Sequence, residues 1–67
     1  MDEFRKGDDV TWKSHGGQAQ GKVKKKITTE TEAAGRTVKA SPEDPQYLVT
    51  SDSGGEAVHK PTALTRA

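Results

Sequence analysis

The chain has 67 residues, enough for one small domain, and we expect that domain to fill residues 1–67 with its core at about residues 4–66. Charged residues make up 31% of the sequence, but the net charge is only +1, which favours neither disorder nor a polyanionic partner. Cysteine is absent from the sequence, which excludes disulfides and thiolate metal sites. No apolar run follows the charged N-terminal residues, so we expect no signal peptide or membrane span. We therefore expect a cytoplasmic protein, and one that is a monomer.

Glycine and proline divide the chain into segments of about five to ten residues, none of which carries a helical period over three turns. An acidic, threonine-rich loop is expected at residues 29–35. Ser41 and Pro42 predict one capped helical turn, and a second short turn is expected at residues 60–63. Alternation of apolar and polar residues predicts five strands, at residues 9–14, 18–28, 36–40, 46–51 and 56–59.

Two of the predicted strands depart from simple alternation. In the second strand Lys25 falls on the apolar side, which predicts a bulge or a strong bend near it, and Gly21 offers a natural bend point. In the fourth strand Tyr47 and Val49 share one face and Leu48 takes the other, so we expect cover on both sides. The residues predicted to form the core are Val10, Trp12, Val23, Ile27, Val38, Val49, Val58 and Leu64.

Five short antiparallel strands in meander order, followed by a tight turn and one further apolar residue, predict an all-β fold. The architecture expected is a small SH3-like (Tudor-like) five-stranded barrel, because closure removes the exposed edges that an open sheet presents.

Four strings of residues also point to a known family. The chain resembles the hypervirulence-associated TUDOR-like domain, and the resemblance covers about residues 4 to 66. It implies a Tudor-like barrel of unknown biochemical function, because a fold does not settle a function. The strings are Phe4-x-Lys6-Gly7-Asp8-x-Val10-x-Trp12, Gly21-x-Val23, Lys39-Ala40-Ser41-Pro42-Glu43-Asp44-Pro45-Gln46-Tyr47 and Ala57-Val58-His59-Lys60-Pro61-x-x-Leu64.

The sequence indicates no catalytic residue, metal site or cofactor. His15 and His59 lie far apart, and a zinc site needs three or four ligands in a workable spacing. Ser14 and His15 are neighbours, but no oriented base or oxyanion motif accompanies them. We therefore interpret the domain as a non-enzymatic binding module.

Its ligand is expected to be a protein or peptide of unknown identity. The three aromatic residues are too few for a full methyl-lysine cage once Trp12 is assigned to the core and Phe4 to a lid over one barrel end. Trp12 and Tyr47 are the candidates for a peptide groove, since a tyrosine hydroxyl often reaches the surface.

The alternative is weak, sequence-nonspecific binding of nucleic acid. Lys22, Lys24 and Lys26 alternate along the second strand, and a regular strand would place all three ammonium groups on one face. The same pattern is also typical of an ordinary solvated strand face. No aromatic residue interrupts the lysines for base stacking, so we rank this function second.

Overall fold

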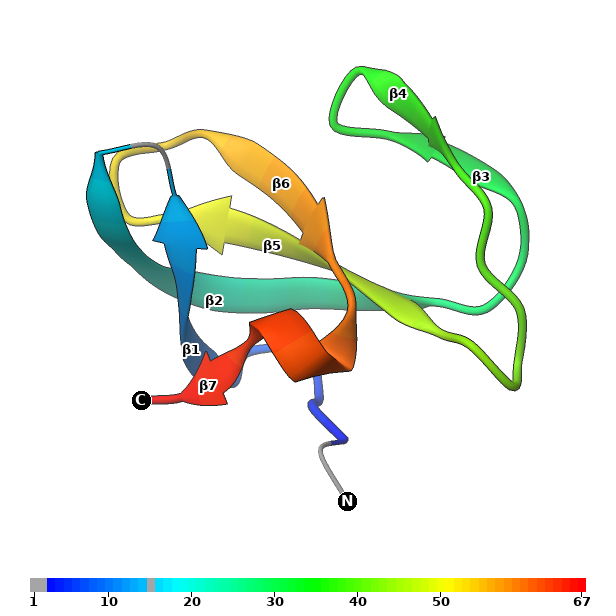
Figure 1. The fold of residues 1–67 in the computed structure, drawn as a ribbon, viewed down its shortest axis with the longest axis horizontal. Helices are drawn as coiled ribbons and strands as arrows, with labels where there is room; N and C mark the ends of the chain where they lie inside the picture. The colour runs from blue at the N-terminus through cyan, green and yellow to red at the C-terminus, as the bar shows by residue number, and fades with distance from the viewer. Residues whose placement is uncertain (1–2, 15) are drawn as a thin grey trace.

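The computed structural model describes residues 3–14 and 16–67, and it is all-β with one short 3-10 turn. Figure 1 shows the elements in chain order. They are β1 (Asp9–Ser14), β2 (Gly17–Ile27), β3 (Thr31–Ala33), β4 (Arg36–Val38), β5 (Gln46–Ser51), β6 (Glu56–His59), η1 (Pro61–Ala63) and β7 (Thr65–Arg66).

The prediction of an all-β domain is confirmed, but the prediction of a closed five-stranded barrel is not. Five strands form one antiparallel sheet in the order β6-β5-β2-β1-β7, and β3 pairs with β4 in a separate two-stranded sheet. Over residues 3–14 and 16–67, no ladder joins β6 to β7. Closure requires both outer strands to meet in register, and β7 has only two residues, which pair with Val10 and Thr11 of β1.

The expected meander order is also wrong, because β2 pairs directly with β5. The segment expected to be the third strand folds instead onto Thr31–Ala33, which had been predicted as loop. Ala34 and Gly35 form the turn between them with φ of 52° and 77°. Two successive positive φ values are typical of a tight hairpin turn, which usually has the sequence Asn-Gly. Here alanine stands in place of asparagine, so the sequence did not indicate a hairpin. The hairpin forms a sheet of its own in Figure 1, and its Val38 packs against Ile27, Leu48 and Val58 of the larger sheet.

The apolar side chains form two clusters on the two faces of β5. All eight residues predicted for the core are buried, as are Phe4, Tyr47 and Leu48. The first cluster contains Phe4, Val10, Trp12, Val23, Tyr47, Val49 and Leu64. The second contains Ile27, Val38, Leu48 and Val58. The prediction that β5 is covered on both sides is therefore confirmed, since Tyr47 and Val49 face one cluster and Leu48 the other.

The bulge predicted near Lys25 is present in β2. The register with β5 shifts between Val23, opposite Val49, and Lys25, opposite Leu48, which leaves Lys24 as the extra residue. Residues directly opposite each other in an antiparallel pair lie on the same face. The bulge therefore turns Lys25 toward the face of Leu48, and it lets Ile27 join the second cluster although Val23 belongs to the first.

The turn predicted around Ser41 is present, but as a tight reversal and not as helix. Ser41 and Asp44 exchange backbone hydrogen bonds, and the backbone N–H of Asp44 also donates to the Ser41 hydroxyl at 3.1 Å. The short turn expected before Leu64 is confirmed as η1.

Candidate functional site

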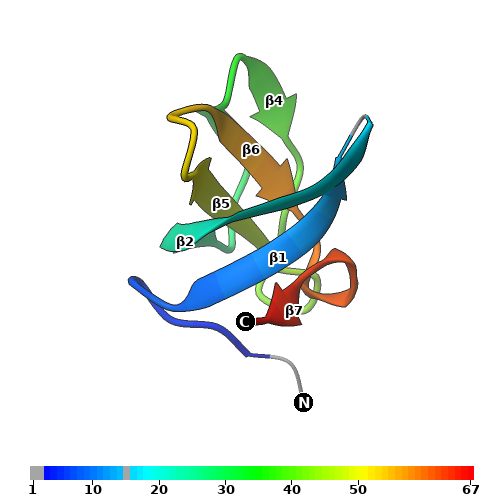
Figure 2. The same cartoon turned by 90° about the vertical axis from the view of Figure 1, so that its left-hand side faces the viewer.

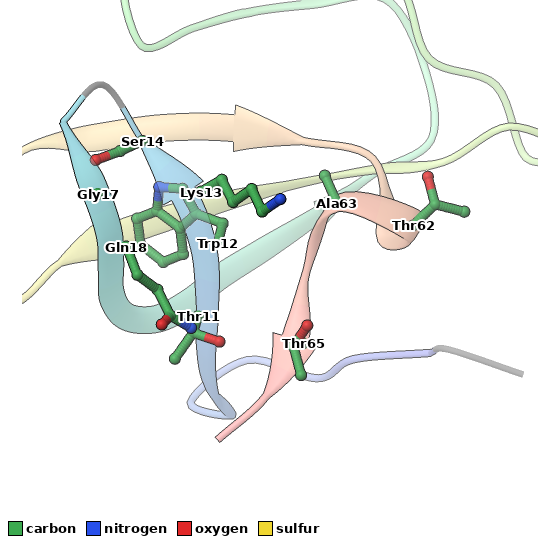
Figure 3. A pocket seen from close by; sticks show the side chains of 9 residues that line it. All are labelled: Thr11, Trp12, Lys13, Ser14, Gly17, Gln18, Thr62, Ala63 and Thr65. Atoms are coloured by element: carbon green, nitrogen blue, oxygen red, sulfur yellow. The ribbon is translucent and has the colours of Figure 1, made fainter.

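A groove runs along the outer edge of β1, between that strand and the segment formed by η1 and β7. Its volume is about 740 Å³, which lies within the size range of small-ligand and peptide pockets. Figure 3 shows Lys13 extending from β1 toward Ala63, while Thr65 lies on β7 at the other side. The lining residues are Thr11, Trp12, Lys13, Ser14, Gly17, Gln18, Thr62, Ala63 and Thr65.

The groove exists because the chain leaves β1 before the strand ends. Thr65 lies opposite Thr11, and the extended residue before it, Leu64, is buried in the same cluster as Trp12. Ala63 would lie opposite Lys13 if β7 continued. Instead Pro61 begins the 3-10 turn η1, in which the Ala63 N–H donates to the Lys60 carbonyl at 2.9 Å. Figure 2 shows β7 beside one part of β1 only.

Arg66 holds β7 in its place. Its guanidinium donates to the Asp8 carboxylate at 3.0 Å and to the Glu3 carbonyl at 2.9 Å, and it lies over the Phe4 ring at 5.1 Å from the ring centroid. The Asp8 carboxylate also accepts from the Arg5 backbone N–H at 2.8 Å. That hydrogen bond, together with Arg66, lowers the pKa of Asp8. Arg66 therefore ties β7 to the N-terminal segment through its contacts with Glu3, Phe4 and Asp8.

Trp12 is both a core residue and part of the groove wall. Its side chain is buried in the first cluster, and the edge that remains lines the groove. On the inner side its ring contacts the imidazole of His59 at a centroid distance of 5.6 Å. Burial, with the nearby charge of Arg36 as a second cause, lowers the pKa of His59. The His59 Nε2 atom is buried with no hydrogen-bond partner among the described residues.

Tyr47, the other residue predicted for a peptide groove, does not line this one. Only 1% of its surface is exposed. Its hydroxyl accepts from the Phe4 backbone N–H at 3.2 Å, and the two rings meet edge to face at a centroid distance of 5.5 Å. The structure thus joins Trp12 and Tyr47 in one core but brings only Trp12 to the groove, because Phe4 covers Tyr47.

The three lysines predicted for nucleic-acid contact do not form a single free stripe. Lys22 lies opposite Thr50, whereas the bulge places Lys26 opposite Tyr47, on the other face of the sheet. Each ammonium also pairs with a carboxylate distant in sequence. The pairs are Lys22 with Asp9 at 2.6 Å, Lys24 with Glu56 at 2.8 Å and Lys26 with Glu3 at 3.0 Å.

These ion pairs shift the pKa values of Glu3, Lys22 and Lys26. The hydrogen bond from Lys26 lowers the pKa of Glu3, and the same bond raises the pKa of Lys26. The hydrogen bond to Asp9 raises the pKa of Lys22 in the same way. Much of the positive charge on β2 is therefore compensated within the domain.

A second, smaller cleft of about 430 Å³ lies between the β3–β4 turn and the larger sheet. Three cations, Lys24, Lys25 and Arg36, line it together with the carboxylates of Glu32 and Glu56. Lys24 is paired with Glu56 at 2.8 Å, and the Arg36 guanidinium donates to the Val58 carbonyl at 3.0 Å. Two of the three cations are therefore already engaged within the domain.

No group of three potential metal ligands occurs in the part of the chain that the structure describes. His15, considered above as a ligand or base, lies outside the described residues. Among the described residues no helix is long and apolar enough to cross a membrane.

A sequence model described as the hypervirulence associated proteins TUDOR domain matches residues 7–64. The chain belongs to this family. It has no significant match among curated proteins or among solved structures. The match begins at the turn before β1 and ends at Leu64, so it includes most of the groove of this TUDOR domain.

Sequence reasoning found Trp12 but missed the rest of the groove. Thr11, Lys13 and Thr65 are exposed or half-exposed polar residues of ordinary strand composition. Nothing in their local pattern shows that β7 would pair with two residues of β1 and leave the others at an open edge.

Proposed function

We propose that this TUDOR domain is a non-enzymatic binding module that holds a peptide segment of a partner protein in the groove between β1 and η1–β7. The observation that carries the proposal is the groove itself, which lies beside a strand edge and has Trp12 in its wall. Membership of the TUDOR-domain family supports the broader idea of a binding module.

The chemistry of the lining favours binding over catalysis. Among the described residues that line the groove only Lys13 carries a charge, and the others offer hydroxyls, an amide, small side chains and part of one indole. General acid–base catalysis needs a positioned proton donor and acceptor with suitable pKa values. Peptide binding needs a shaped apolar surface with a few polar groups that fix orientation, and this groove provides both.

The test is selection of peptides from a random displayed library on the intact domain. Thr65→Arg places a long side chain in the groove, and Thr37→Arg makes the same change at an exposed position of β4, away from the groove. Selected peptides should bind the wild type and Thr37→Arg equally and should lose at least about tenfold in affinity for Thr65→Arg.

Peptides that bind all three proteins equally would place the binding site elsewhere. If repeated selections yield no peptide that binds, the proposed function is wrong.

A further inference from the structure

We infer that the partner segment held in the groove carries an acidic residue, and that its carboxylate lies between Thr11, Lys13 and Thr65. This inference rests on the proposed function, because it names the chemical class of peptide that the groove accepts. Three observations carry it: the common face of these side chains, the lack of partners for their polar ends among the described residues, and the sign of the charge in the groove lining.

The first observation is that the three side chains project from the same face of the sheet. Val10 and Trp12 are buried in the first cluster. Thr11 and Lys13 alternate with them along β1 and therefore point to the opposite face. Thr65 of β7 lies directly opposite Thr11, and residues opposite each other share a face. Figure 3 shows the Lys13 ammonium and both threonine hydroxyls directed toward the space between β1 and the η1–β7 segment.

The spacing of these side chains suits one small anion. Side chains two residues apart in a strand are separated by about 6.5–7 Å, and directly opposite ones by about 4.5–5.5 Å. A carboxylate between them is therefore within reach of the long Lys13 side chain and of the Thr11 and Thr65 hydroxyls. One of its hydrogen bonds then comes from a charged donor, and such bonds are stronger than those between neutral groups.

The second observation is that these donors are not engaged within the part of the domain that the structure describes. Lys13 takes part in no salt bridge there. No hydrogen bond joins its ammonium or the Thr11 and Thr65 hydroxyls to another described residue. Lys22 differs, because it lies opposite Asp9 and pairs with it at 2.6 Å. A ligand at Lys13 therefore gains contacts without breaking an ion pair of the fold.

The third observation is the sign of the charge. Among the described residues that line the groove there is no carboxylate, and Lys13 is the one charged group. Gln18, opposite Lys13 on β2, adds a neutral amide on the same face. One positive charge with neutral donors fits a singly charged carboxylate. A phosphorylated side chain carries about −1.5 to −2 charges at pH 7, and its sites are typically clusters of arginine. The acid is accordingly glutamate or aspartate.

The test uses two random peptide libraries displayed on phage, one encoding all residues and one lacking aspartate and glutamate. Both are selected on the whole chain. The recovered peptides are made with amidated C-termini, so that no terminal carboxylate is present, and their binding is followed by fluorescence anisotropy. Lys13→Glu is compared with the matched control Lys39→Glu, which makes the same change of charge at an exposed position outside the groove lining.

We expect peptides from the full library to share an acidic residue at one position. Replacing that residue by its amide should weaken binding about fivefold or more. Lys13→Glu should weaken it about tenfold or more, because attraction becomes repulsion, whereas Lys39→Glu should change it by less than about twofold. Thr65→Val removes one hydroxyl and should lose about two- to tenfold. Selection on Lys13→Glu should return lysine or arginine at the same position, which a merely structural effect of the substitution would not produce.

Equally tight binders from the library without acids, blocked by Thr65→Arg, would overturn the acidic ligand and leave the proposed function intact. Acidic peptides that bind wild type and Lys13→Glu equally would also overturn it, because their carboxylate would lie elsewhere. A phosphoserine in place of the acidic residue that tightens binding more than about tenfold would make phosphate the ligand and overturn the carboxylate assignment. If neither library yields a binder, the proposed function is wrong, and this inference with it.

Discussion

Replacing Gly21 by alanine tests the way in which β2 passes β5. Gly21 lies in β2 opposite Val10 of β1 and Ser51 of β5, where both neighbouring strands approach it. A Cβ atom added there would lie 2.0 Å from the Thr50 carbonyl oxygen and 2.9 Å from the Ser51 Cα. Both obstacles are backbone atoms, which no rotamer change can move.

The size of the effect follows from that distance. A carbon and a carbonyl oxygen approach to about 3.3 Å at the closest, so Gly21→Ala must push β5 away by about 1.3 Å, which breaks part of the β2–β5 ladder. Overpacking in a well-packed core costs about 1–3 kcal/mol and occasionally more. We expect about 3 kcal/mol here, which corresponds to a fall in Tm of about 12–24 °C for a domain of this size.

The assay is urea and thermal unfolding followed by far-UV circular dichroism, with Gly55→Ala as the matched control. A Cβ at Gly55 meets nothing within 4 Å, and the backbone there is not in the positive-φ region. That variant should be neutral or about 0.4–1 kcal/mol more stable, since alanine restricts the unfolded chain. If Gly21→Ala loses less than about 1 kcal/mol, the close crossing of the two strands is not as described.

Three further predictions concern the core, the buried histidine and the lysines. Trp12→Ala should cost about 3–5 kcal/mol, much of the stability of so small a domain, and an unchanged melting curve would contradict the burial of Trp12. Because the pKa of His59 is lowered from its ordinary 6.5, the unfolded chain binds the proton more tightly, so the free energy of unfolding should be greatest above pH 6.5 and should decrease as the pH falls below it. His59→Gln should remove that decrease in urea titrations, whereas equal slopes would show that another group, such as His15, is responsible. The compensated charges of Lys22, Lys24 and Lys26 predict no complex with labelled DNA or RNA at physiological salt and only weak binding at low salt. Tight binding at physiological salt that disappears in the triple Lys→Glu variant would contradict this.

The strands illustrate how far local sequence information extends. The ranges 9–14, 46–51 and 56–59 were predicted to the residue, because alternation and the flanking glycines and prolines are properties of short segments. The bulge near Lys25 was predictable for the same reason, since a single lysine on an apolar face reveals a change of register. All eight predicted core residues are buried, and seven of them lie in strands, where alternation shows which side chains point inward.

The pairing of strands and of charges was decided by the tertiary structure. Asp9, Glu3 and Glu56 lie far from their lysine partners in the sequence, and no local pattern shows that they neutralise β2. The separate β3–β4 hairpin depends on a positive φ at Ala34, which alanine adopts only when its surroundings impose it.

The groove, too, was predictable from the sequence only in part. The sequence determined by itself that Trp12 lies in a core strand and that a tight turn precedes Leu64. Only the folded chain decided that this turn leaves β1 after a two-residue pairing, so that Lys13 lies at an open edge. The physical reason is that a strand edge stays open where no neighbouring strand pairs with it. How far β7 pairs with β1 depends on contacts between opposite ends of the chain, such as Arg66 with Asp8.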